Sequence, residues 1–95
     1  MERRALTSDE IAALAQALPQ WSVQDGMLVR VATAPSFRVA LDWVASIGNA
    51  AEAMDHHPDI DIRYRTLTLR LRTHDLDALS TWDIELARQI DAIIG

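Results

Sequence analysis

The sequence predicts an α+β fold in which a four-stranded antiparallel sheet carries three helices on one face, in the order α-β-β-α-β-β-α. Three stretches place apolar residues at three- and four-residue spacing, which is typical of amphipathic helices, and four shorter stretches alternate apolar with polar residues, which is typical of strands. The strand-like stretches come in two pairs with short connections, so each pair is expected to form a hairpin. Alternation indicates a sheet with one covered and one open face.

The first predicted elements are a short helix and a hairpin. Thr7-Ser8-Asp9-Glu10 has the pattern of a capping box, and helical spacing extends from it to Leu18, the residue before a proline. Residues 21–23 and 27–31 are β-type runs, and the connection between them contains Asp25-Gly26. Asp-Gly supplies the positive φ that a tight hairpin turn needs, so the two runs are expected to pair antiparallel.

The longest predicted helix covers about residues 37–54. It follows Pro35-Ser36, and its apolar positions recur at three- and four-residue spacing. We expect this helix to bury one continuous face, formed by Phe37, Leu41, Val44, Gly48 and Ala51.

A second hairpin and a third helix complete the predicted fold. Residues 60–64 and 67–71 both alternate, but the parity of the apolar positions changes at Arg65-Thr66, which predicts a tight turn or bulge there. Ser80-Thr81-Trp82-Asp83 again resembles a capping box and is expected to start a helix that runs to about Ile94.

Composition limits the possible functions. The chain has 95 residues, enough for one domain over residues 1–95, and carries 9 basic against 14 acidic residues. An acidic balance gives no electrostatic basis for binding nucleic acid or an anionic membrane surface. The absence of cysteine excludes disulfides, thiolate zinc sites and a thiol nucleophile. No apolar run approaches the length of a membrane span or a signal segment, so we expect a cytoplasmic protein.

All three histidines fall at the two ends of the second hairpin. His56 and His57 precede it, and His74 follows it. Histidine is the side chain that exchanges protons near neutral pH, so this clustering predicts an acid/base site. Glu52 lies four residues before His56, and if the helix continues that far the two side chains share a face, where the carboxylate is expected to hold or tune the imidazole.

Structural interpretations of the same residues stay open. His56 and His57 are also suited to the C-terminal end of a helix, where cationic side chains interact favourably with the helix dipole. Three imidazoles are the ligand set of some zinc sites, although adjacent histidines converge poorly on one ion. His74 is equally interpreted as an exposed loop residue that hydrogen-bonds Asp75, and Asp83 as the reciprocal partner in the cap of the last helix.

Aromatic and basic residues also carry expectations. Trp21 and Tyr64 are expected in the core or at its edge, and Trp82, in the first turn of a helix, is a candidate subunit contact. The arginines near the second hairpin favour a solvated sheet face over an anionic-ligand site; they are Arg63, Arg65, Arg70 and Arg72.

The motifs together resemble the pterin-4a-carbinolamine dehydratase family. The specific part of the resemblance is a His-His-Pro element followed by Thr-His-Asp, and the similarity extends from Trp21 through the last helix. The residues that carry it are Ala51-Glu52, His56-His57-Pro58, Tyr64, Thr73-His74-Asp75, Leu79-Ser80, Asp83, Leu86-Ala87 and Ile90-Asp91.

The resemblance implies a function and an assembly state. It implies four antiparallel strands with three helices on one face, assembly into a homodimer or homotetramer, and a small-molecule pterin as substrate, with no separate cofactor and no metal. The substrate would be a 4a-hydroxytetrahydropterin formed by an aromatic amino acid hydroxylase, to which the protein would be functionally coupled. The implied catalytic residues are His56, His57, His74 and Glu52, and the implied substrate-binding residues are His57, Asp55, Ile60, Thr73, Asp75 and Asp83.

Dehydration needs one acid and one base, and the histidines suit both roles. Our hypothesis is that His56 and His74 flank the C4a hydroxyl, one of them as acid, while His57 helps to hold the pterin and Glu52 tunes His56. The alternative from a different class is a non-catalytic role in protein binding, assembly or dimerisation, which members and relatives of this family also have. Such a role needs a surface and has no use for three clustered histidines.

Three positions depart from the family pattern. Ala78 stands where glycine is usual, so a positive φ in the His74 loop would be strained there. Ile60 stands where an aromatic residue is common, which would weaken stacking on the pterin. Arg65 replaces a frequent asparagine.

Overall fold

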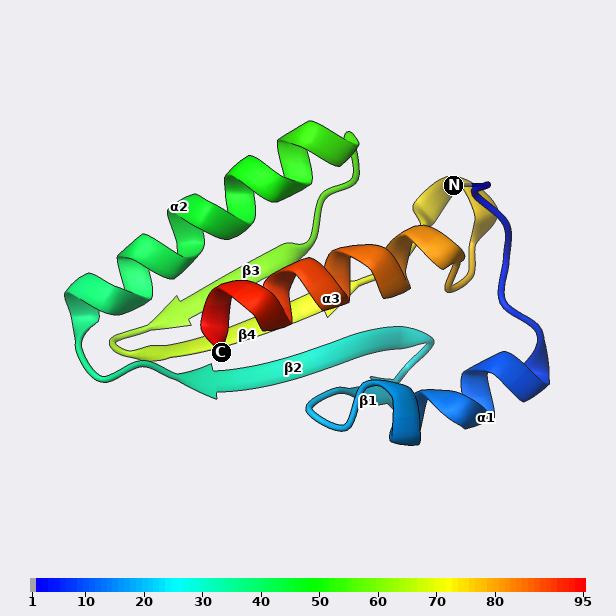
Figure 1. The fold of residues 1–95 in the computed structure, drawn as a ribbon, viewed down its shortest axis with the longest axis horizontal. Helices are drawn as coiled ribbons and strands as arrows, with labels where there is room; N and C mark the ends of the chain where they lie inside the picture. The colour runs from blue at the N-terminus through cyan, green and yellow to red at the C-terminus, as the bar shows by residue number, and fades with distance from the viewer. Residues whose placement is uncertain (1) are drawn as a thin grey trace.

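A computed structural model describes residues 2–95 and confirms the predicted α+β class and element order (Figure 1). The helices and strands differ from the predicted bounds by no more than two residues where bounds were given, and a short 3₁₀ helix follows the last strand. The elements are α1 (Ser8–Ala17), β1 (Ser22–Gln24), β2 (Met27–Thr33), α2 (Phe37–Met54), β3 (Asp59–Arg63), β4 (Thr66–Leu71), η1 (His74–Leu76) and α3 (Thr81–Ile94). Among the described residues, no helix is long and apolar enough to cross a membrane.

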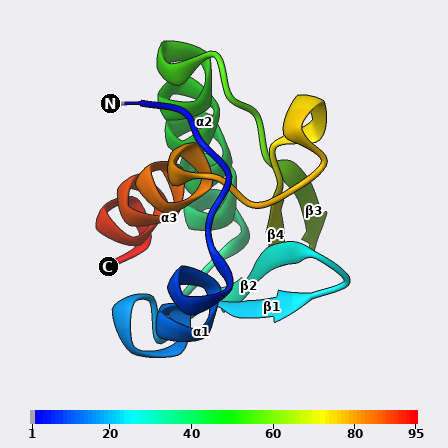
Figure 2. The ribbon, with the colours of Figure 1, turned by 90° about the vertical axis from the view of Figure 1, so that its right-hand side faces the viewer.

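The four strands form one antiparallel sheet in the order β1-β2-β4-β3. Two hairpins therefore lie side by side, joined by pairing of β2 with β4. Figure 2 shows α2 and α3 together on one side of this sheet, with α1 beside the β1–β2 hairpin. Leu28 of β2 pairs with Leu71 of β4, and along the opposite edge of β4, Leu67 pairs with Ile62 of β3. Both pairs lie on the face of the sheet that the helices cover.

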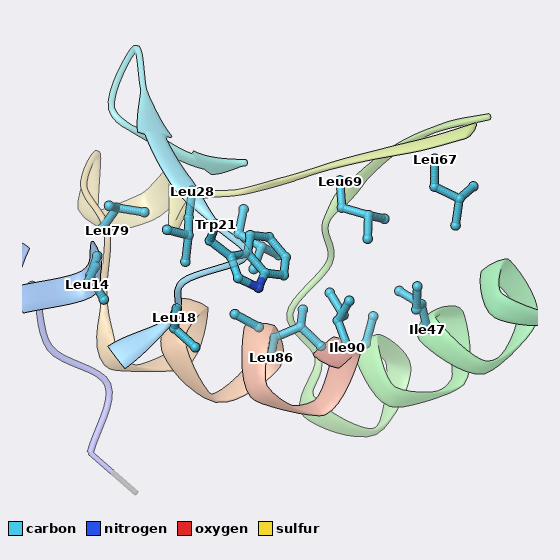
Figure 3. Close-up of a cluster of buried hydrophobic side chains, with 13 residues drawn as sticks. Leu14, Leu18, Trp21, Leu28, Ile47, Leu67, Leu69, Leu79, Leu86 and Ile90 are labelled. Carbon is cyan, nitrogen blue, oxygen red and sulfur yellow. The ribbon is translucent and has the colours of Figure 1, made fainter. Parts of the chain in front are cut away.

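The core forms between the sheet and the helices. Leu67, Leu69 and Leu71 are each fully buried at every second position of β4, as the alternation predicts. In Figure 3, Leu67 and Leu69 point from the sheet toward Ile47 of α2 and Ile90 of α3. Each such side chain contributes about 1.5–3 kcal/mol of transfer free energy on burial, so this layer fixes α2 and α3 against the strands.

One side of α2 is buried, but the stripe differs from the predicted one. The buried positions are Ala40, Ile47 and Ala51, with Val44 partly buried between them, whereas Phe37 at the first position is 46% exposed. The prediction of a Phe37-based face was wrong because a residue in the first turn projects beyond the end of the sheet.

The caps and the first turn are as predicted. Thr7 caps α1, and Ser36 caps α2 by accepting a hydrogen bond from the Val39 backbone N–H. Asp25 and Gly26 have φ of 53° and 73°, the positive values that a two-residue hairpin turn requires. The β1–β2 register is therefore set by local sequence.

The second turn lies one residue earlier than predicted, at Tyr64-Arg65, and Tyr64 takes a left-handed φ of 53°. Trp21 is buried, as expected, but Tyr64 is 71% exposed and stacks on Phe37 with ring centroids 6.3 Å apart. The expectation of a core or core-edge position for Tyr64 was wrong because a turn residue lies beyond the last strand pair, Arg63 with Thr66, where only the exposed Phe37 packs on it.

Candidate active site

The C-terminal end of α2 separates the two adjacent histidines. The helix ends at Met54, and Asp55 adopts the left-handed conformation, with φ of 50°. The His56 backbone N–H then donates back to the Ala51 carbonyl at 3.1 Å, which caps the helix in the manner of a left-handed C-terminal motif. As a result His56 points inward and is 8% exposed, whereas the side chain of His57 stays 55% exposed.

The third histidine is presented by the loop after β4. The backbone of Thr73 pairs with that of Ala78, and the loop between them contains η1, which begins at His74. The positive φ in this loop, 51°, falls on Asp77, and the expectation of strain at Ala78 was therefore wrong. His74 is exposed at the end of the strand, as the sequence predicts.

The two loops enclose a pocket of about 480 Å³, a size typical of sites for small molecules. All three histidines line it. Its remaining walls come from two carboxylates, two guanidinium groups and one indole, and the full lining is Arg3, Asp55, His56, His57, Arg72, His74, Asp75 and Trp82. Residues 55–57 and residues 74–75 meet in space, which is the clustering that the sequence predicts.

His56 is held from behind by the carboxylate of Asp83. Its Nε2 lies 2.6 Å from Asp83 Oδ1, and Asp83 is fully buried. Asp83 Oδ2 accepts hydrogen bonds from the Ser80 backbone N–H and the Thr73 hydroxyl, both at 2.9 Å, and the Thr73 and Ser80 hydroxyls lie 2.5 Å apart. Both oxygens of this buried group are thus satisfied.

This arrangement assigns a tautomer to His56. A carboxylate only accepts hydrogen bonds, so the proton of the bond lies on Nε2, and Nδ1 is the nitrogen that can exchange a proton with a ligand. The indole of Trp82 packs edge-on against the same imidazole, with centroids 5.8 Å apart and planes at 89°. His56 is therefore fixed in position and orientation by groups on α3. Trp82 lines the pocket of the single chain, a position that the sequence did not predict.

Glu52 pairs with His57 and not with His56, which corrects the predicted pairing. Glu52 Oε2 lies 2.8 Å from His57 Nε2, and both side chains are largely exposed. The helical spacing on which the prediction rested does not extend to residue 56, because α2 ends at Met54 and the chain reverses at Asp55. An exposed pair of this kind contributes at most about 1 kcal/mol.

A second ion pair lies on the His74 side of the pocket. Arg3 Nη1 lies 2.5 Å from Asp75 Oδ1, and this hydrogen bond lowers the pKa of Asp75 below its ordinary value. Arg72 is paired with Asp77. Carboxylate and guanidinium are therefore both present at the pocket wall, and neither charge dominates it.

Some of the predicted substrate-binding residues lie outside the pocket lining. Thr73 and Asp83 are buried behind it, in the network that holds His56, and Asp83 is also the predicted partner in the capping box of α3. Ile60 lies on β3 and does not line the pocket. Arg65 lies at the β3–β4 turn, also away from the lining. Within residues 2–95, no group of three or more histidine or acidic side chains is arranged to hold a metal ion.

The chain is similar over almost its whole length to one protein family. Residues 4–93 match the model of the family described as pterin 4 alpha carbinolamine dehydratase. A protein of Mycobacterium leprae, named "Putative pterin-4-alpha-carbinolamine dehydratase", is 44% identical over 90 residues, covering 95% of this chain and 96% of that protein. A protein of Nocardia farcinica with the same name is 43% identical over 93 residues, covering 98% of each.

Solved structures give the same result for the fold. The crystal structure of a transcriptional coactivator/pterin dehydratase from Brucella melitensis superposes with a TM-score of 0.92 at 30% identity, covering 97% of this chain and all of that one. A pterin dehydratase-like protein identified as a RuBisCO assembly factor in the alpha-carboxysome has a TM-score of 0.65 at 17% identity, covering 79% of this chain and 87% of that one, and shares the fold alone.

Proposed function

The chain belongs to the pterin 4 alpha carbinolamine dehydratase family, and from this premise we propose that it removes water from a 4a-hydroxytetrahydropterin. The product would be a quinonoid dihydropterin, and the reaction would recycle the cofactor of an aromatic amino acid hydroxylase. The observation that carries the proposal is the pocket in which three histidines meet, one of them held by a buried carboxylate.

The reaction is an elimination that needs one proton delivered and one removed. The N5 lone pair forms the C4a=N5 bond as the C4a–O bond breaks, and the departing hydroxide takes a proton from an acid to leave as water. The resulting iminium then loses its N5 proton to a base. Hydroxide is a poor leaving group, so the acid determines much of the barrier, and histidine has the pKa range that suits both steps near neutral pH.

His56 and His74 are the proposed acid and base. They lie on opposite loops of the pocket, one after α2 and one after β4, so a bicyclic ligand between them would have an imidazole on either side. The Nε2–H of His56 donates a hydrogen bond to Asp83 in both charge states of the ring. The carboxylate stabilises the imidazolium, and proton exchange is restricted to Nδ1. His57 and its partner Glu52 lie at the exposed edge, where they are proposed to hold the pterin.

A protein-binding role is the second candidate function. It is favoured by the description of the Brucella protein, at 30% identity, as a transcriptional coactivator as well as a pterin dehydratase. A binding surface would make no use of three histidines gathered on one pocket, so the site itself favours the enzyme.

Stopped-flow absorbance of freshly generated 4a-hydroxytetrahydropterin tests the proposal, because the uncatalysed dehydration provides its own baseline. The wild-type protein is expected to accelerate the decay. His56→Ala and His74→Ala are each expected to lower the rate constant by on the order of a hundredfold or more, the usual contribution of general acid/base catalysis. Near-full activity in either variant would remove that residue from the mechanism.

A further inference from the structure

The N-terminal segment, residues 2–6, runs along the start of α3 and reaches the pocket. Its backbone pairs with the residues that precede and begin α3: the Leu6 N–H donates to the Leu79 carbonyl at 2.9 Å, and the Thr81 N–H donates to the Arg4 carbonyl at 3.0 Å. Ala5 and Ser80 form a β-bridge. Figure 1 shows the N-terminal chain beside the loop that precedes α3. Residues 2–6 are thus attached to the element that carries Asp83 and Trp82.

Arg3 is the residue of this segment that lines the pocket. One guanidinium nitrogen bonds Asp75, the neighbour of His74, and the guanidinium carbon lies 5.4 Å from the centroid of the Trp82 ring. Trp82 in turn contacts His56. Arg3 therefore spans the two walls that present the proposed acid and base.

We propose that Arg3 is a substrate-binding residue of this pocket, held there by the backbone hydrogen bonds of its segment. This inference rests on the proposed pterin function. A guanidinium has five N–H donors in a plane, and over residues 2–95 only Asp75 accepts a hydrogen bond from that of Arg3. The ring of a pterin offers a carbonyl oxygen and ring nitrogens as acceptors, and its flat face suits stacking on a planar cation.

Two features favour binding over a structural role. The side chain of Arg3 is 35% exposed, so its ion pair with Asp75 contributes little to folding. The segment is held by backbone bonds of residues 4 and 6, which do not need the Arg3 side chain.

The neighbouring arginine provides a matched control. Arg4 forms a bidentate ion pair with Glu10 at 2.7 and 2.8 Å and does not line the pocket. Arg3→Gln and Arg4→Gln each remove one positive charge from the same segment, but only the first removes it from the pocket. Both variants would be compared with wild type in steady-state dehydration, and in calorimetric titration with 7,8-dihydrobiopterin, a stable pterin that cannot be dehydrated.

Arg3→Gln is expected to raise KM and to weaken dihydrobiopterin binding by on the order of tenfold, the usual effect of losing a hydrogen bond to a charged group, with kcat within about twofold of wild type. Arg4→Gln is expected to match wild type in KM, in dihydrobiopterin affinity and in kcat. Equal KM and affinity in the two variants would overturn the inference, as would a lower kcat for Arg3→Gln at unchanged KM.

The titration separates this inference from the proposed function. Wild-type protein that binds dihydrobiopterin through Arg3 without accelerating dehydration would contradict the dehydratase and support the binding residue. Active wild-type protein with an unaffected Arg3→Gln variant would contradict the binding residue alone. Wild-type protein that neither binds the pterin nor accelerates dehydration would overturn both.

Discussion

Replacement of Asp83 by asparagine separates its catalytic role from its role as a helix cap. The carboxylate accepts three hydrogen bonds, one from His56 and the others from the Ser80 N–H and the Thr73 hydroxyl. An asparagine amide accepts through only one atom. If its nitrogen faced Ser80, two donors would be opposed, so we expect the nitrogen to face His56 Nε2. His56 Nε2 must then accept a hydrogen bond from the amide, and the ring proton moves to Nδ1.

The wrong tautomer is expected to lower kcat by between about a hundredfold and ten-thousandfold, the range that general acid/base catalysis and the orienting carboxylates of other enzymes supply. The lost charge-assisted bond should cost about 1.5–3 kcal/mol of stability. At about 4–8 °C per kcal/mol for a domain of this size, a loss of about 2 kcal/mol lowers Tm by about 8–16 °C. Stopped-flow dehydration and thermal unfolding by circular dichroism would measure the two effects.

Asp91→Asn is the matched control on the same helix. Asp91 accepts hydrogen bonds from Arg30 and Trp21 Nε1, at 2.5 and 2.8 Å, and does not line the pocket. The Asp91→Asn variant should lose a similar amount of stability and keep the kcat of wild type. Full activity in Asp83→Asn would reduce Asp83 to a helix cap, and equal losses of activity in both variants would refute the assignment of a specific orienting role.

Three other predictions concern the edge of the site, the cap of α1 and the core. His57→Ala should raise KM for the pterin by more than it lowers kcat, because His57 is placed at the exposed edge; a kcat loss as large as that of His56→Ala in steady-state assays would contradict this. The ion pair with Arg4 lowers the pKa of Glu10 from 4.5 to about 2, so its stabilisation is present above pH 4.5 and is lost as the pH falls toward about 2. Tm measured between those pH values should fall less in Glu10→Gln than in wild type, and parallel curves would refute this. Leu69→Ala, at a fully buried position, should cost about 2–5 kcal/mol in urea unfolding, and a cost below 1 kcal/mol would indicate that the core collapses around the cavity.

Local patterns were sufficient to predict most of the fold. Capping boxes at Thr7 and Ser80 mark the starts of two helices, Asp25-Gly26 fixes one hairpin, and the change of parity before β4 marks the other to within one residue. These signals are short-range, so each is visible in the sequence. Where the geometry depends on the end of an element, as for the burial of Phe37 and Tyr64, periodicity alone gave the wrong result.

The sequence pointed to the three histidines and to two carboxylates that line the pocket, Asp55 and Asp75, but not to the side-chain contacts that hold the histidines in place. Glu52 was assigned to His56 by helical spacing, which fails because α2 ends two residues too early. The actual partner, Asp83, lies 27 residues away, and its capping role gave a complete local explanation of why it is acidic. Arg3 has no sequence signal, because its contact with Asp75, 72 residues away, exists only once the N-terminal segment docks beside α3.

The most direct test of the central claim compares wild-type protein with the His56→Ala, His74→Ala double variant, using the stopped-flow decay of 4a-hydroxytetrahydropterin after both proteins are shown to be folded by circular dichroism. The proposal predicts acceleration well above the uncatalysed decay by the wild type and none by the double variant. A folded wild-type protein without acceleration, or a double variant as fast as wild type, would contradict histidine-based dehydration in this pocket.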